Sequence, residues 1–172
     1  LQLASEESGL STEVFEKADE QSSQGIMSGV FGMRFPFIND NGLTYGNNYL
    51  TNDALFKIQS DVIRQLAEQK SCLFVGRCAD YILRDNPRCV NIFIASTMDF
   101  RLERIQRSFQ LSKEKAEELI EKTDKKRASY YNYYTYKTWG AAESYHLCID
   151  SSVLGIDGTV EFVKKFIMRK LV

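Results

Sequence analysis

The sequence predicts an α/β protein built on a parallel sheet, with helices on both faces, and two observations support this fold class. A continuous apolar run lies at 72–75, and largely apolar runs of six and four residues lie at 90–95 and 147–150. Such runs are typical of strands that are covered on both faces. Segments with helical features separate them, and alternating strands and helices form parallel sheets. Because no repeat or linker divides the chain, we expect one domain over residues 1–172.

The N-terminal third begins with a predicted helix and then loses its periodicity. Ser11 or Thr12 can cap a helix that runs to about Ala18. Residues 19–52 hold five of the ten glycines, with aromatic residues interleaved among them. A stretch of this length is typical of either a functional cover or a disordered loop. We expect a substrate cover, and both interpretations stay open.

The rest of the chain alternates between helices and strands. Helices are predicted over about 53–70, 79–83 and 99–107, from Leu111-Ser112 onward, and after the strand at 147–150. Asn52 or Asp53 can cap the first of these helices, and Ser96 or Thr97 the third.

The composition argues against several classes of protein. The net charge of -1 and the pI of about 6.0 provide no overall positive field for nucleic acid or an anionic membrane. The four cysteines show no C-x-x-C spacing, and a single histidine leaves little for a zinc site. No segment has the roughly 18 to 20 apolar residues that span a bilayer. We therefore expect a cytoplasmic protein with free thiols.

Gly76 and Arg77 follow the strand predicted at 72–75. Ligands of open α/β sheets bind beyond the carboxyl ends of the strands, where loops present polar groups. The planar guanidinium of Arg77 suits a phosphate, and Gly76 permits a sharp turn. An ion pair of Arg77 with Asp80 or Asp85 is the alternative, and the residues alone do not decide between them.

Three segments resemble, in order and spacing, bacterial cytidylate kinases and more closely the cytidylate-kinase-like branch. They are Val75–Asp80, Val90–Ser96 and Ile149–Leu154. The resemblance implies a P-loop kinase fold that uses ATP and Mg²⁺ to phosphorylate a nucleoside monophosphate, most simply CMP or dCMP. In that family the Arg of a G-R-D-x-G-T motif binds the acceptor phosphate, which implies this role for Arg77. Cys78 replaces the motif's Asp and the G-T pair is absent, so Asp80 becomes the candidate for the sugar contact.

The resemblance also implies a lid over about residues 104–136. Asp124-x-x-Arg127 resembles the family's lid pattern, in which Asp contacts the sugar and Arg reaches the transferring phosphate. Residues 122–127 gather four cations around this one carboxylate, an imbalance that indicates phosphate binding. Arg104 is implied to contact ATP, although arginines every three residues at 101–107 are also typical of a solvated helix face.

Asp150 ends the last predicted strand. The resemblance implies a position near Mg-ATP for this residue. The alternative interpretation is that Asp150 caps a turn over Ser151–Gly158.

Five of the nine tyrosines lie within residues 130–136, directly after the cationic segment. Aromatic side chains beside cations are typical of proteins that bind single-stranded nucleic acid by stacking on its bases. The helical spacing of the tyrosines favours packing against a core instead. A nucleic-acid binder is therefore kept as the alternative from outside the enzymes.

The P-loop motif G-x-x-x-x-G-K-[ST] does not occur, because no glycine of the sequence precedes a lysine. The resemblance starts after the family's first strand, P-loop and first helix. We therefore expect these elements upstream of Leu1. A nucleotide-binding or sensing protein of the same fold, catalytically altered at Cys78, is the other alternative.

Overall fold

The computed structural model describes residues 52–171, and the chain forms two compact units, Leu1–Arg77 and Cys78–Val172. The described part of the first unit is helix α3 (Asn52–Gln69) and the segment after it. Leu55, Val62 and Ile63 of α3 are buried, as the helical spacing predicts. The helix predicted near 53–70 is thus confirmed. The helix predicted at 11–18 and the irregular stretch before Asn52 lie outside the described residues.

The strand predicted at 72–75 is not formed. This segment has no regular secondary structure, and Leu73 and Val75 are 91% and 86% exposed. A strand exists only through hydrogen bonds to a neighbour, and the sheet within residues 52–171 pairs β1 and β2 alone. The apolar run indicates a preference for burial, but it cannot supply the neighbouring strand.

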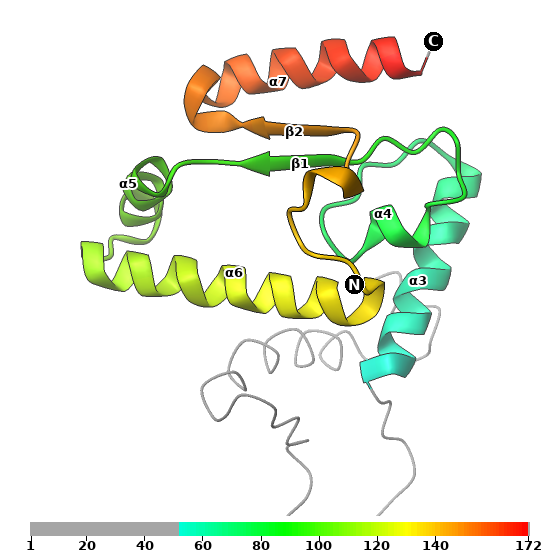
Figure 1. The fold of residues 1–172 in the computed structure, drawn as a ribbon, viewed down its shortest axis with the longest axis horizontal. Helices are drawn as coiled ribbons and strands as arrows, with labels where there is room; N and C mark the ends of the chain where they lie inside the picture. Colours follow the sequence, from blue (N-terminus) through cyan, green and yellow to red (C-terminus); the bar gives the residue numbers. More distant parts are fainter. Residues whose placement is uncertain (1–51, 172) are drawn as a thin grey trace, which may run out of the picture. The chain divides into compact units, whose positions relative to one another are not determined.

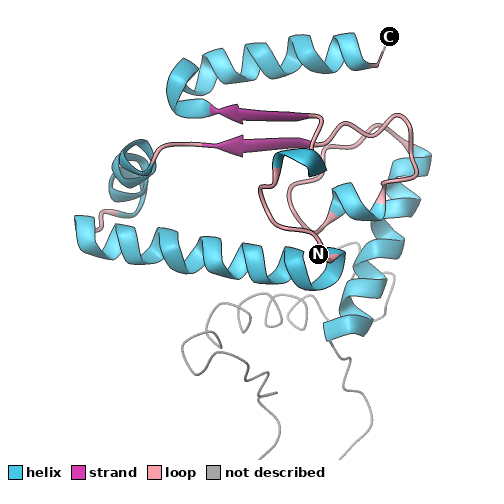
Figure 2. Cartoon of the chain, in the orientation of Figure 1, coloured by secondary structure: helices cyan, strands magenta, loops and turns pink. Residues whose placement is uncertain are grey.

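The second unit contains the sheet, and its elements are shown in Figures 1 and 2. In chain order they are α4 (Ala79–Ile82), β1 (Ile92–Ala95), α5 (Met98–Phe109), α6 (Lys113–Thr135), the 3-10 helix η2 (Ala142–Ser144), β2 (Leu147–Asp150) and α7 (Ser151–Lys170). β1 and β2 are parallel, with Ile92 opposite Leu147 and Ala95 opposite Asp150. The prediction of an α/β protein with a parallel sheet is confirmed, and the carboxyl ends of both strands lie level.

Helices α5 and α6 share a small apolar core. Leu102 of α5 is buried against Ala116 and Ile120 of α6, and Ile105 and Leu111 pack beside them. The predicted start of α6 is confirmed, since the Ser112 hydroxyl accepts a hydrogen bond from the backbone N–H of Lys115 at 3.4 Å. The N-terminal half of α6 is therefore anchored to α5.

An aromatic cluster anchors the other end of α6 to β1. The ring of Phe93 in β1 lies 5.4 Å from Trp139 and 5.1 Å from Tyr145, between centroids. The ring of Tyr131, in the last turns of α6, stacks on Tyr145 at 6.5 Å. Gly140 can lie against Phe93 because it has no Cβ, since a Cβ at this position would come within 3.1 Å of the ring. Figure 1 shows α6 on the side of the strands opposite to α7.

Helix α7 packs against both strands and begins directly after β2. It is kinked at Gly155, whose φ of 66° and ψ of -179° suit glycine almost exclusively. The hydroxyl of buried Thr159 donates to the Gly155 carbonyl at 2.6 Å and so gives this carbonyl at the kink a hydrogen-bond partner. Among the described helices, none combines the length and apolar character needed to cross a membrane.

Candidate functional site at the carboxyl ends of the strands

The carboxyl ends of β1 and β2 present a polar edge. Ser151 follows β2, and its hydroxyl donates to the carbonyl of Ala95 in β1 at 2.9 Å. The hydroxyl oxygen of Ser96 is buried there and has no hydrogen-bond partner within the described part of the chain. Small polar groups thus gather where the ligands of open α/β sheets bind.

Asp150 caps helix α7 at this edge. Its Oδ1 accepts hydrogen bonds from the Ser152 hydroxyl at 2.6 Å and from the Ser152 backbone N–H at 2.9 Å. These bonds hold the pKa of Asp150 below its usual range, because they favour the charged carboxylate. The cap interpretation is therefore confirmed, although the helix starts at Ser151 without an intervening turn. The role near Mg-ATP stays a prediction.

A bidentate ion pair joins α5 to α6. Arg101 contacts Asp124 through both guanidinium nitrogens, with Nη2 at 2.8 Å from Oδ1 and Nη1 at 2.7 Å from Oδ2. Both side chains are partly buried, so the pair is less screened than a surface pair. Arg101 lies in the first turn of α5, where its N–H bonds to the Thr97 carbonyl. The pair therefore lies close to the carboxyl end of β1.

Arg101 is a residue that sequence reasoning did not single out. The spacing of the arginines at 101–107 does not distinguish one from another. In the structure Arg101 reaches Asp124, whereas Arg107 pairs with Glu103 on the exposed side of α5. The signal that could have distinguished Arg101 is its place in the first turn of the helix that follows β1.

The inward stripe of α6, which is the line of positions buried at both ends of the helix, carries charged residues in its middle. Ala116 and Ile120 are buried near its start, and Tyr131 and Thr135 are buried near its end. Asp124 and Arg127 fall on the same stripe between them, at steps of three or four residues. Asp124 is partly buried and Arg127 is exposed. An amphipathic helix normally continues its apolar stripe, so this polar gap is unusual.

Arg104 and Arg127 lie on the two helices that the ion pair joins. Each follows its member of the pair by three residues, and both side chains are exposed. No ion pair of either arginine is found within residues 52–171. The structure brings their helices together and leaves both guanidinium groups on the surface.

Arg77 lies in a run of left-handed backbone. Gly76, Arg77 and Cys78 have φ values of 69°, 57° and 56°. Two of the three are not glycine, and each such residue costs on the order of 1 kcal/mol. Gly76 alone was expected to turn here, and the structure extends the turn over both following residues. Cys78 is buried and Arg77 is half-buried.

Asp80 bonds to a tyrosine of α6. Its Oδ2 accepts a hydrogen bond of 2.7 Å from the Tyr131 hydroxyl. The Tyr131 side chain is only 6% exposed. Burial, with the adjacent Asp80 carboxylate, raises the pKa of Tyr131 far above its ordinary value. Sequence reasoning missed this pair, because Tyr131 stands among four similar tyrosines and Asp80 is 51 residues away.

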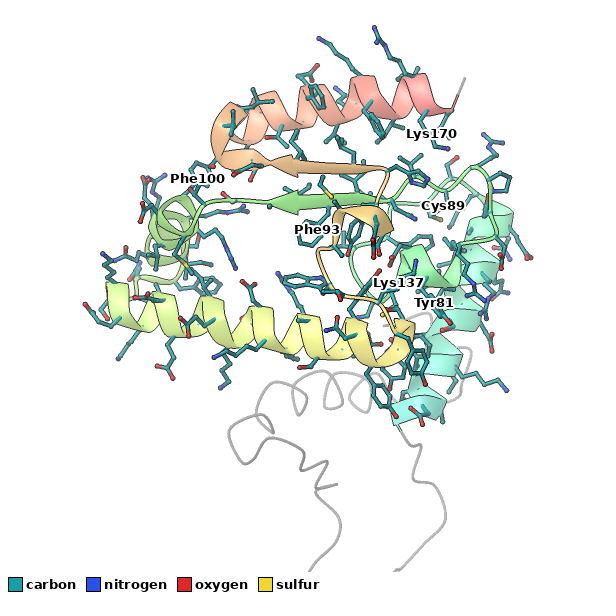
Figure 3. All side chains as sticks on the ribbon, viewed as in Figure 1. Tyr81, Cys89, Phe93, Phe100, Lys137 and Lys170 are labelled. Atoms are coloured by element: carbon teal, nitrogen blue, oxygen red, sulfur yellow. The ribbon has the colours of Figure 1, made fainter. Side chains whose placement is uncertain are left out.

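The five tyrosines at 130–136 do not behave as one surface. Tyr131 is buried, the rings of Tyr130 and Tyr134 pack edge to face with centroids 4.8 Å apart, and Tyr136 is 92% exposed. Figure 3 shows Phe93 directed from β1 toward the segment that follows α6, where the aromatic cluster lies. The packing expected for the tyrosines therefore holds for part of the group.

The described residues do not gather a magnesium site. Within residues 52–171 no group of three or more His, Cys, Asp or Glu side chains could hold a metal ion. Mg²⁺ usually keeps several waters and takes one or two carboxylates with the substrate's phosphates, so it needs no such group.

Comparisons with known proteins identify the family of this chain. The model of the cytidylate kinase-like family matches residues 1–153. No curated protein matches the sequence. A crystal structure of an uncharacterized protein from Eubacterium ventriosum ATCC 27560 is similar, with 31% identity and a TM-score of 0.65, over 67% of this chain and 73% of that chain. Since the family model spans most of the sequence, the chain belongs to the cytidylate kinase-like family.

Proposed function

We propose that this protein transfers the γ-phosphoryl group of ATP to a nucleoside monophosphate, CMP or dCMP. Membership of the cytidylate kinase-like family indicates a nucleotide-kinase type of function. The acceptor, the use of ATP and the P-loop kinase fold are the further steps that we propose.

The polar gap in the inward stripe of α6 is the observation that carries the proposal. Phosphoryl transfer involves little covalent chemistry by the protein, and catalysis consists mainly of positioning and of charge stabilisation. Arg101 places a cation near the carboxyl end of β1, where the ligands of this fold class bind, and Arg127 lies about one turn beyond its partner Asp124 on α6. Arginine is suited to this task because its planar fork matches phosphate oxygens.

We assign the three arginines to different phosphate groups. Arg77 would hold the phosphate of the acceptor throughout the reaction, from its turn after the segment at 72–75. Arg127 would reach the transferring phosphoryl group, and Arg104 would contact ATP. Mg²⁺ supplies charge neutralisation at the phosphates when it is bound with ATP.

Each of the three carboxylates has a proposed ligand contact that would compete with, or add to, its present hydrogen bonds. Asp124 would contact the sugar of the acceptor, which requires its oxygens to exchange Arg101 for sugar hydroxyls. The released Arg101 would then be available to a phosphate. Asp80 would reach the sugar only if it left Tyr131, and Asp150 would approach Mg-ATP while capping α7.

Turnover of all common nucleoside monophosphates with Mg-ATP tests the proposal. A coupled assay for the nucleoside diphosphate product should show faster conversion of CMP or dCMP than of AMP or GMP. Thermal stabilisation by each nucleotide, measured in parallel, reports binding without chemistry. Binding of nucleotides with no turnover of any acceptor would contradict the kinase proposal and favour a sensing protein of the same fold.

A further inference from the structure

We propose that Tyr131 is a positioning residue, whose hydrogen bond to Asp80 fixes the C-terminal half of α6 and thereby aims Arg127. The catalytic part of this inference rests on the proposed function. Its structural part concerns a contact that is independent of any substrate.

The contact joins a buried donor to a charged acceptor. The Tyr131 hydroxyl lies 2.7 Å from Oδ2 of Asp80, and the tyrosine is almost fully buried. A hydrogen bond to a carboxylate in such surroundings is stronger than one between neutral groups. A tyrosine hydroxyl is protonated at neutral pH and so can donate, and burial raises the pKa of Tyr131 further above its ordinary value.

Tyr131 is well placed to control Arg127. The two residues are four apart on α6, so they share one face and are separated by about 6 Å along the helix axis. The helix runs unbroken from Lys113 to Thr135. Movement of the helix at Tyr131 would therefore move the Cα of Arg127, from which its side chain extends, by a similar amount.

The two halves of α6 are held by different means. Leu102 packs against Ala116 and Ile120, and Arg101 binds Asp124, so the N-terminal half is fixed to α5. Beyond Asp124, the buried anchors of the stripe are Tyr131 and Thr135. The Thr135 hydroxyl donates to the Tyr131 carbonyl and accepts from the Lys137 backbone N–H, so among the described residues it joins α6 only to the segment directly after it. Tyr131 therefore supplies the polar tie of this half to α4, and its ring contact with Tyr145 supplies an apolar one.

This contact gives Asp80 a role other than the sugar contact expected for it. One of its carboxylate oxygens already accepts from Tyr131, and the residue lies in the first turn of α4. That helix starts two residues after Arg77 in the sequence. Asp80 thus acts on the reaction through α6 rather than through the substrate.

Removal of the hydroxyl alone tests the inference. Tyr131→Phe keeps the ring and loses the donor, and Tyr133→Phe is the matched control on the exposed side of the same helix. Since a hydrogen bond to a charged group is lost, amides of residues 124–135 should exchange with solvent about tenfold faster in Tyr131→Phe and unchanged in Tyr133→Phe. Equal exchange in both variants would overturn the inference, whether or not the protein is active.

The kinetics separate positioning from simple stabilisation. Tyr131→Phe should lower kcat about tenfold with little change in the KM of the acceptor, and Tyr133→Phe should change neither. In an Arg127→Ala background, Tyr131→Phe should add almost nothing, because the group that it aims is gone. Additive losses would contradict the inference.

Variants of Asp80 distinguish positioning from direct substrate contact. Asp80→Asn retains an acceptor for the tyrosine and should keep most of kcat, whereas Asp80→Ala should match Tyr131→Phe. A raised KM of the acceptor in Asp80→Ala, with normal kinetics in Tyr131→Phe, would restore Asp80 to the sugar and refute the inference. Wild-type protein without turnover refutes the proposed function, and the amide exchange then still decides on the contact.

Discussion

At the residue scale, every carboxylate predicted to meet a ligand has a partner within the protein. Asp80 accepts from Tyr131, Asp124 binds Arg101, and Asp150 caps α7. Partial burial explains this pattern, since a charge removed from water without a partner is costly. A ligand that uses one of these groups must therefore replace an existing contact, which makes the exchange of partners part of binding.

Asp150 offers a test of the cap at this scale. Asp150→Ala should lower the melting temperature by a few degrees, while Asp150→Asn, which also caps helices well, should restore most of it. The folded pKa lies below the ordinary 3.8, so the cap contributes fully above that pH and its contribution disappears as the pH falls through the folded value. The difference in melting temperature between wild type and Asp150→Ala should therefore shrink below about pH 4.

The same substitutions measure the role near Mg-ATP. If Asp150 only caps α7, then Asp150→Asn leaves the KM of ATP unchanged. A raised KM of ATP at an unchanged melting temperature would instead identify the carboxylate charge as a contact to the metal–nucleotide complex.

At the element scale, helices α5 and α6 are held by a small apolar core and one bidentate ion pair. The core has few members, Leu102, Ala116 and Ile120 with their neighbours. Arg101 and Asp124 are partly buried and make two short contacts. Apolar contacts have little directional preference, whereas the two contacts of this ion pair require one geometry. The pair therefore fixes which turn of α5 meets which turn of α6.

A double-mutant cycle measures this pair. Arg101→Met and Asp124→Ala, alone and combined, should reveal a coupling of about 1 kcal/mol in chemical unfolding, at the upper end for ion pairs that reach water. The pair of Arg107 and Glu103 within α5 is the control, and its more exposed side chains should couple by about 0.5 kcal/mol or less. Equal coupling for the two pairs would mean that the geometry of Arg101 and Asp124 adds nothing to stability.

The elements also show what the sequence can predict. Helix α3, the strand at 147–150 and the cap at Ser112 follow from local patterns, because periodicity and hydrogen-bonding side chains act within a few residues. The apolar run at 72–75 has the same local signal, yet it is unpaired in the structure. Pairing depends on a partner elsewhere in the chain, and no local pattern contains that information.

The site was predictable to a similar degree. The strand ends, Asp150 as a cap and the cations of α6 follow from order and spacing. The contacts of Asp80 with Tyr131 and of Arg101 with Asp124 span 51 and 23 residues. Each depends on how the helices pack, so residue types alone could not select these partners from the similar residues nearby.

At the scale of the whole molecule, the proposed function gives Arg77 and Arg127 different roles. Arg77 ends the unit Leu1–Arg77, and Arg127 belongs to the unit Cys78–Val172. Their surroundings differ, since Arg77 is half-buried in a left-handed turn and Arg127 is exposed on a continuous helix. A half-buried residue in a turn suits steady binding, and an exposed side chain on a helix suits a contact made only during transfer.

Kinetics of Arg77→Ala and Arg127→Ala should separate these two roles. Loss of a charge-assisted phosphate contact costs on the order of 1.5 to 3 kcal/mol, so Arg77→Ala should raise the KM of the acceptor roughly tenfold or more and lower kcat less. Arg127→Ala should lower kcat and kcat/KM together, because its contact is made only in the transition state. Lys164→Ala, at an exposed cation of α7 that pairs with Glu161, is the control and should change neither.

Stability decides whether the arginines act in the site or in the fold. Both variants should melt near the wild-type temperature, since substitutions of charged surface residues usually change stability by no more than about 0.5 kcal/mol. If either variant unfolds readily while its folded fraction works normally, that arginine is a structural ion-pair partner. Arg77 is the more demanding case, because alanine also has to adopt its φ of 57°. A left-handed alanine costs about as much as a left-handed arginine, so a large loss of stability would point to the guanidinium's contacts and not to the backbone.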